Sequence, residues 1–261
     1  MLRIIITTIA LTICTFSYAK RSEPSIIHFD VSENKVMFNQ NISDTRSIAS
    51  VTKLMTAMVA LDYSTDMNKQ LSLVRKVKSS LPPKSYTRGE LFEAMLIRSD
   101  NAAAETLASD YPGGRDAFLK AMNKKTCDLG MNSTYFKDPT GLNMSNTSTA
   151  NEVVNMVIAA SNYPTIKNIS IRKQTLIETK FKKKVRKIVL YNTNRRVLFE
   201  FDNVVVSKTG FTNPAGYCVA IMVEQNNRKH VIVILGAKNS KERVDTVKEI
   251  MYNNIIDGEH H

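Results

Sequence analysis

Residues 46–58 read RSIASVTKLMTAM, and this stretch decides the fold. From Ser50 onward its apolar residues recur at the spacing of a buried amphipathic helix: Leu54, Ala57, Met58 and Leu61. We therefore expect a helix that runs from Ser50 to about Asp62. Ser50 and Lys53 are three residues apart, so a helix places them on one face with their Cβ atoms about 5–6 Å apart.

A serine that hydrolyses peptides needs a base beside its hydroxyl, and histidine is the usual one. The histidines of this chain do not suit that role, because they fall in a predicted strand, a late hairpin and the terminal tail: His28, His230, His260 and His261. A lysine does the same work where burial and neighbouring cations lower its pKa. The pattern S-x-x-K occurs at Ser17, Ser32, Ser50 and Ser170, and only the copy at Ser50 opens an apolar helix, whose first turn also offers N–H groups to an oxyanion.

Two further tripeptides belong with this helix. Ser99-Asp100-Asn101 lies between two predicted helices, where a short loop presents side chains to a cleft. Lys208-Thr209-Gly210 lies at the end of a predicted strand that starts at Val204. Each tripeptide alone is ordinary turn chemistry or a solvated strand end. In this order, and each on the element that its role requires, the three motifs together indicate a serine hydrolase with a lysine base.

The pattern around these motifs predicts an α+β fold. Strands are expected at 26–30 and 35–39, then helices at 50–62, 88–97, 102–108, 115–125 and 150–161, then strands at 174–179, 187–191, 204–209, 217–224 and 229–235, and a closing helix at 241–252. Thr87 and Glu90 form a capping box at the start of the second helix. Strands at both ends with helices between them favour an antiparallel sheet built from both termini and covered by a helical lobe.

The first nineteen residues are typical of a secretory signal peptide. Arg3 precedes an apolar run over residues 4–16, and Ser17-Tyr18-Ala19 offers a cleavage site. Cys14 follows a bulky Ile13, which argues against a lipoprotein signal, and the run is shorter than a membrane span requires. We expect one exported domain over residues 20–261, located in the periplasm or cell envelope, with at most peripheral membrane association.

Charge and cysteine content narrow the partners. The chain carries 36 basic and 24 acidic residues, and its densest basic run, residues 182–187, is expected to be a solvated hairpin. Anionic wall polymers or lipid headgroups suit such a surface, whereas nucleic acid does not, because there is no Trp and no pattern of aromatic and basic residues. Cys127 and Cys218 either pair or remain as two buried thiols, and no cluster of ligands indicates a metal.

With its three motifs, the chain resembles the D-alanyl-D-alanine carboxypeptidase and endopeptidase family of low-molecular-mass penicillin-binding proteins, peptidase family S11, above all the penicillin-binding protein 7 type of DD-endopeptidase. The likeness covers roughly residues 25–255 and includes the stretches at 46–58, 138–142, 191–194 and 208–213. It implies a five-stranded antiparallel sheet of the β-lactamase and DD-peptidase kind. The chain departs from the family at Arg195-Arg196, where Pro-Leu is expected, and this affects the shape of one loop.

The resemblance also implies the roles of the site residues. Ser50 is the acylated nucleophile, Lys53 its general base, and Ser99 passes a proton toward the leaving group. Asn101 holds an amide of the substrate, while Lys208 and Thr209 face its terminal carboxylate. Gly210 lets the substrate backbone lie against the strand, and the N–H groups of Ser50 and Phe211 form the oxyanion hole. The expected substrates are peptidoglycan stem peptides, with β-lactams as covalent inhibitors and no cofactor.

Four other functions compete with a DD-endopeptidase. A class A β-lactamase needs a glutamate to activate the deacylating water, and no Glu occurs between Glu105 and Glu152. A D-alanyl-D-alanine carboxypeptidase that trims terminal D-alanine stays open, although the segment after Gly210 has room for two strands and a helix but not for the separate β domain and membrane anchor of many carboxypeptidases. A non-catalytic penicillin-binding module is disfavoured because every motif residue is present. A polyanion-binding protein depends on net charge alone.

Overall fold

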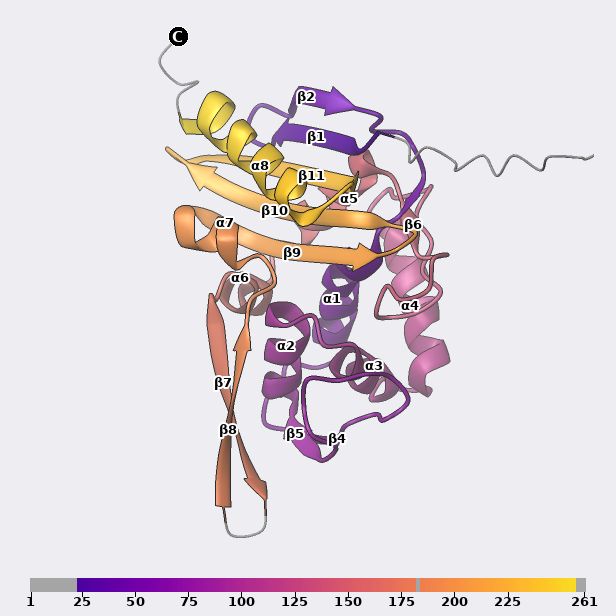
Figure 1. Cartoon of the computed structure of the whole chain (residues 1–261). Coiled ribbons are helices and arrows are strands. Elements are labelled where there is room, and N and C mark those ends of the chain that lie inside the picture. Colours follow the sequence, from indigo (N-terminus) through magenta and orange to yellow (C-terminus); the bar gives the residue numbers. More distant parts are fainter. Residues whose placement is uncertain (1–22, 182–183, 257–261) are drawn as a thin grey trace, which may run out of the picture.

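A computed structural model of the chain describes residues 23–181 and 184–256 (Figure 1). At its centre is a five-stranded sheet in the order β2-β1-β11-β10-β9, in which each neighbouring pair is antiparallel. The strands are β1 (Ser25–Asp30), β2 (Lys35–Gln40), β9 (Val204–Thr212), β10 (Gly216–Gln225) and β11 (Arg228–Ala237). Because β1 pairs with β11, both ends of the chain build the sheet, and this confirms the α+β architecture predicted from the sequence.

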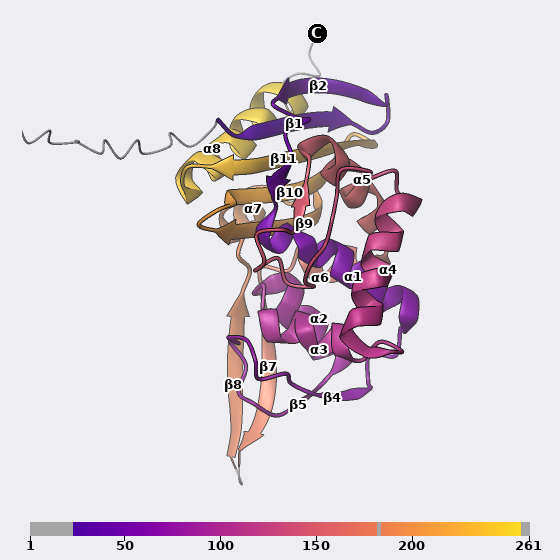
Figure 2. The same ribbon diagram turned by 90° about the vertical axis from the view of Figure 1, so that its right-hand side faces the viewer.

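The sheet separates two apolar cores, because successive side chains of a strand point to opposite faces. On β10, Ala220 and Met222 pack with the helical lobe, whereas Val219 and Ile221 pack on the other face. That other face is covered by α8 (Ser240–Ile250), with α7 (Arg195–Glu200) and the π-helical η2 (Met251–Ile256) beside it. The view in Figure 2 shows α8 on one side of the sheet and α5 (Ala150–Ala160) on the other.

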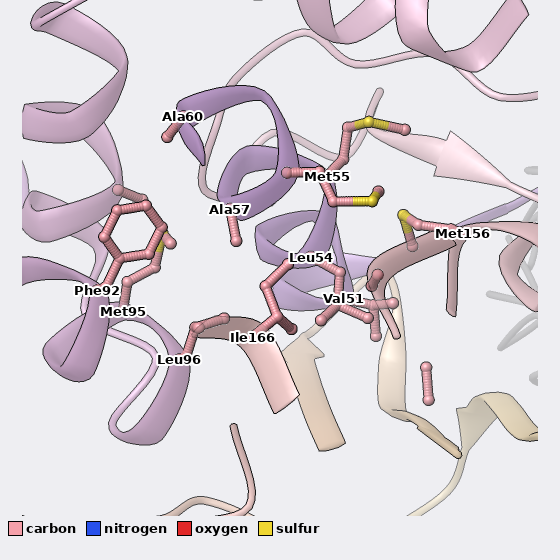
Figure 3. Close-up of a cluster of buried hydrophobic side chains, with 14 of the residues drawn as sticks. Val51, Leu54, Met55, Ala57, Ala60, Phe92, Met95, Leu96, Met156 and Ile166 are labelled. Carbon is pink, nitrogen blue, oxygen red and sulfur yellow. The ribbon is translucent and has the colours of Figure 1, made fainter. Parts of the chain in front are cut away.

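The helical lobe is built around α1 (Lys53–Tyr63), which follows a 3₁₀ turn, η1 (Ala49–Thr52). Around it lie α2 (Arg88–Ile97), α3 (Asn101–Ser109), α4 (Gly114–Asp128), α5 and α6 (Pro164–Ser170). Every residue of α1 from Lys53 to Leu61 is buried, and Figure 3 shows its apolar side chains against Phe92, Met156 and Ile166 of three neighbouring helices. A helix that is enclosed all round places whatever polar group it carries inside the protein. Lys53 and Thr56 are such groups.

Three smaller strand pairs complete the structure. β3 (Arg46–Ser47) pairs with β6 (Thr147–Ser148), and β4 (Gln70–Ser72) pairs with β5 (Ser85–Thr87). β7 (Gln174–Phe181) and β8 (Lys184–Tyr191) form a long hairpin that extends away from the sheet alongside α2 (Figure 1). The basic run predicted as a hairpin falls on this element, where Arg186 and Lys187 are exposed and residues 182–183 are outside the described part.

Some sequence predictions need correction. The expected helix from Ser50 divides into η1 and α1, so Ser50 lies on a 3₁₀ turn. The helices α6 and α7 were not predicted, because segments of 7 and 6 residues are too short for a periodic pattern. Both remaining cysteines are free, and Cys127 is exposed, so only Cys218 is a buried thiol.

The expected signal peptide at residues 1–19 lies outside the described residues. Within 23–181 and 184–256, no helix combines the length and the apolar character needed to cross a membrane.

Two histidines that are 202 residues apart in the chain meet inside the sheet. His28 on β1 and His230 on β11 are buried, with His28 Nε2 3.2 Å from His230 Nδ1. Burial, and secondarily His230, lowers the pKa of His28 to about 4, while Asp30 opposes this shift. Asp30 itself is held by Arg228 through a 2.6 Å ion pair. The neutral form of His28 is therefore favoured in the folded state.

This burial predicts a loss of stability in mild acid. Between pH 6.5 and about 4 the unfolded chain protonates His28 and the folded chain does not, so the contribution of His28 is present above pH 6.5 and lost as pH falls toward 4. The full loss is on the order of 3 kcal/mol. Urea unfolding at a series of pH values should show a flatter dependence for His28→Asn. An equally steep dependence in the variant would contradict this origin.

Candidate active site

The first motif places a serine and a lysine in direct contact. Lys53 Nζ is 2.8 Å from Ser50 Oγ, and the lysine side chain is completely buried. The backbone bends sharply just before this pair, since Ala49 has a φ of 46°. The predicted proximity of Ser50 and Lys53 is thus confirmed, although the 3₁₀ turn and not an α-helical turn produces it.

Lys53 is surrounded by oxygen atoms. Besides Ser50 Oγ, its Nζ lies 2.7 Å from Asn101 Oδ1 and 2.7 Å from the carbonyl oxygen of Thr140. Burial lowers the pKa of Lys53 from 10.5 to about 7, against the opposing charges of Asp138, Asp100 and Glu105. A buried amine with this pKa is available in both protonation states near neutral pH.

The second motif is a strained turn between α2 and α3. Ser99 has a φ of 63°, an uncommon conformation for a residue other than glycine. Its Oγ is buried and has no hydrogen-bond partner within the described residues. Asp100 points away and caps α3 through Ala103 N, while it also accepts hydrogen bonds from Ser80. The aspartate therefore shapes the turn, and the serine and Asn101 on either side of it line the same cavity as Ser50.

The sequence predicts the third motif at the end of a strand. In the structure the motif lies within β9, which continues to Thr212. Lys208 is buried on the lobe-facing side, where its Nζ donates to Thr209 O at 2.9 Å. Thr209 Oγ1 donates to Thr193 Oγ1 at 2.6 Å. Burial lowers the pKa of Lys208 well below its ordinary value, and the charges of Lys53 and Arg243 lower it further.

The role expected for Gly210 requires a different physical reason. A Cβ atom at this position would lie 2.9 Å from Ile48 O and 2.9 Å from Ser50 N. Glycine is needed because β9 packs directly against η1, and this need is independent of any substrate that binds along the strand. This close approach sets the strand beside the backbone N–H of Ser50.

The motif residues surround one cavity of about 400 Å³. Its lining includes Ser50, Ser99, Asn101, Thr209, Gly210 and Phe211 from the prediction, and Leu142, Thr193, Tyr217, Ser240 and Arg243, which had no predicted role. Lys53 and Lys208 lie buried beneath these residues. Arg243 is 6% exposed, and its Nε has no hydrogen-bond partner among the described residues. No sequence signal marked Arg243, because it belongs to an ordinary amphipathic helix, whereas Thr193 lies in a stretch that carried the family resemblance.

The loop at 138–143 closes the site opposite β9. Asp138 Oδ1 accepts hydrogen bonds from Thr140 N and from Gly141 N, at 2.6 and 2.7 Å. This places the Thr140 carbonyl against Lys53. Gly141 has a φ of 81°, and a Cβ there would lie 1.9 Å from Ala49 O, so the loop and η1 touch backbone to backbone. No group of three or more His, Cys, Asp or Glu side chains is placed to hold a metal in the part of the chain described here.

Comparisons with known proteins identify the family of the chain. The chain matches the family described as D-alanyl-D-alanine carboxypeptidase, peptidase S11, over residues 15–239. The D-alanyl-D-alanine endopeptidase of Escherichia coli is 36% identical over 231 residues, which are 85% of this chain and 74% of the relative. The D-alanyl-D-alanine endopeptidase of Pseudomonas aeruginosa is 35% identical over 216 residues, 80% of this chain and 69% of the relative.

Solved structures give the same fold. Penicillin-binding protein D2 from Listeria monocytogenes, in its ampicillin-bound form, is 27% identical with a TM-score of 0.76, covering 87% of this chain and 94% of that one. A Streptomyces DD-transpeptidase, at 22% identity, has a TM-score of 0.80 over 87% and 94% of the two chains. Together the fold and the sequence matches define a serine-type DD-peptidase, a hydrolase. The chain belongs to the D-alanyl-D-alanine carboxypeptidase family, as its sequence motifs predicted.

Proposed function

We propose that this protein is a DD-endopeptidase of the cell envelope, which hydrolyses D-alanyl cross-links between peptidoglycan stem peptides through an acyl-enzyme on Ser50. The observation that carries the proposal is the 2.8 Å contact between Ser50 Oγ and Lys53 Nζ. A neutral amine has two N–H donors and one lone pair. Because Asn101 Oδ1 and Thr140 O only accept hydrogen bonds, they take the two donors, and the lone pair faces the serine hydroxyl.

The reaction follows from this geometry. Lys53 Nζ accepts the hydroxyl proton of Ser50 while Oγ bonds to the carbonyl carbon of D-alanine, and the C–N bond then breaks. The leaving amine receives the proton from Lys53 through Ser99, whose buried Oγ has no competing hydrogen bond among the described residues, and Lys53 returns to its neutral form. A water molecule next attacks the ester, gives its proton to Lys53, and the proton returns to Oγ as Ser50 is released.

Backbone and amide donors hold the reacting group. The N–H groups of Ser50 and Phe211 form the proposed oxyanion hole, supported by the close packing of β9 on η1 at Gly210. Asn101 turns its Oδ1 to Lys53, which leaves the Nδ2 group to donate to a substrate carbonyl.

Cations prepare the site for an anionic D-alanyl end. Lys208 and Arg243 both have lowered pKa values, first because they are buried, and the charges of Lys53 and Arg243 add to the shift of Lys208. A bound carboxylate would offset this repulsion, and the Thr209 hydroxyl, which donates to Thr193 Oγ1 in the free site, would turn to donate to it. The carboxylate of a penicillin suits the same position. We expect penicillins to acylate Ser50 and to remain, since no glutamate lies between Glu105 and Glu152 to activate a deacylating water.

The names of the relatives support cleavage of cross-links over removal of terminal D-alanine. Those from Escherichia coli, Pseudomonas aeruginosa and Haemophilus influenzae, at 36%, 35% and 30% identity, are named D-alanyl-D-alanine endopeptidases. A carboxypeptidase that trims terminal D-alanine is the alternative, since a Bacillus subtilis relative at 29% identity bears that name. We further propose that residues 20–261 form one exported domain that acts in the periplasm.

Digestion of purified cross-linked muropeptides tests the proposal. Mass analysis should show dimers converted to monomers by the wild-type protein, with Ser50→Ala as the inactive blank that also fails to label with fluorescent penicillin. Release of terminal D-alanine alone, with dimers intact, would refute the endopeptidase assignment and favour the carboxypeptidase.

A further inference from the structure

A second cavity opens beside the active site. It has a volume of about 530 Å³ and lies between the end of β8, the start of α7 and the start of α8. It shares three lining residues with the active-site cavity: Thr193, Ser240 and Arg243. The two cavities are therefore adjacent, and they meet at Arg243.

Arginines distinguish this second cavity, which we name the arginine cavity. Arg98, Arg195, Arg196 and Arg243 all line it, and none of its lining residues is acidic. No ion pair among the described residues involves any of the four. Arg195 lies over the ring of Tyr191, 5.7 Å from its centroid, which holds that side chain along the cavity. The charge of Arg196 reaches Arg243, since it contributes to the lowered pKa of Arg243.

An uncompensated group of this kind favours an anionic ligand. Solvated surface arginines are ordinary when they stand apart, because water screens each one. Here Arg243 is buried with its Nε unsatisfied, and its neighbours add charge of the same sign. Carboxylates match the planar guanidinium through paired hydrogen bonds, so a ligand with several carboxylates fits best. The Arg195-Arg196 pair is also where this chain departs from the family pattern.

We propose that the arginine cavity binds the carboxylates of the stem peptide that leaves when the cross-link is cut. This inference deepens the proposed function and depends on it. The amine that leaves belongs to a second stem peptide, and the carboxylate next to the scissile bond lies at Arg243 and Thr209. The rest of that stem must continue past Arg243, into the cavity that Arg243 shares. A single terminal D-alanine would end before reaching Arg195 and Arg196.

The test compares two synthetic cross-linked dimers, one with free carboxylates on the leaving stem and one with its glutamate carboxylate converted to a primary amide. For the wild type, we expect amidation to lower kcat/KM by about tenfold, mainly through KM. The double variant Arg195→Gln/Arg196→Gln should lose about the same factor on the free dimer and nothing further on the amidated one. Lys120→Gln/Lys124→Gln on α4 removes the same charge elsewhere and should behave as wild type.

Each other outcome overturns the inference. An arginine variant with wild-type kcat/KM on the free dimer shows that the cavity does not contact the leaving stem. Equal losses on the free and amidated dimers show that the arginines do not bind the glutamate carboxylate of the leaving stem. Penicillin acylation, measured alongside, verifies that Ser50 and Lys53 remain assembled in the variant. If the wild type cleaves neither dimer, the proposed endopeptidase function has failed, and this is seen before any variant is compared.

Discussion

Replacement of Lys53 with methionine should slow acylation of Ser50 by penicillin about 10³-fold or more. Methionine fills similar space but has no lone pair to accept the hydroxyl proton, and general bases contribute about 10²–10⁴-fold to such steps. Stopped-flow measurement of acylation, with thermal unfolding to verify the fold, gives the comparison. Near-wild-type acylation in a folded variant would mean that another group takes the proton.

The same lysine sets the pH dependence of the wild type. Its pKa is lowered to about 7 by burial, and only the neutral amine accepts a proton. The acylation rate should therefore rise as pH increases through about 7 and level off above it. A rate that stays constant from pH 5 to pH 9 would contradict lysine as the base.

Gly141→Ala should damage the site from outside the three motifs. Its Cβ would lie 1.9 Å from Ala49 O and 2.9 Å from Ser50 N, so either the loop or η1 must move. A shift of about 1 Å in the nucleophile is enough to cost about 10²-fold in rate. We expect acylation to fall by about that factor, and the free energy of unfolding to fall by about 3 kcal/mol from the overlap and the positive φ.

Gly130→Ala is the matched control. Gly130 also has a positive φ, 67°, but a Cβ there meets no atom within 4 Å. This variant should lose only about 1 kcal/mol of stability and no acylation rate. If the two variants lost acylation rate and stability to the same extent, the close contact with η1 would not be the reason for a glycine at position 141.

Local patterns in the sequence predicted a large part of the structure. The capping box at Thr87 and Glu90 begins α2 as expected, because a cap depends only on residues three apart. The five strands of the sheet were placed within a few residues for the same kind of reason, since alternation is read along one segment. The helices α6 and α7 were not predicted, because packing against neighbouring elements stabilises them and their own sequences show no periodic pattern.

The site was predictable to the extent that it is written in motifs. Ser50, Lys53, Ser99 and Asn101 meet in space as the three-motif pattern implied. Arg243 and the Thr140 carbonyl were not expected, because neither a helix arginine nor a backbone oxygen leaves a recognisable pattern. Gly210 was expected, but its reason lies in the packing of β9 on η1, which only coordinates reveal.

The amino-acid sequence by itself determined the longer elements, their order, and which serine has a lysine one turn away, since these depend on short-range spacing. The tertiary structure alone decided that Lys53 is buried with its amine against the Ser50 hydroxyl, that His28 meets His230, and that four arginines gather around one cavity. Burial and charge are properties of neighbours that are distant in the chain, and pKa values follow from them. For that reason the pKa values of the site residues are set only in the folded protein, where segments that are distant in the chain surround them.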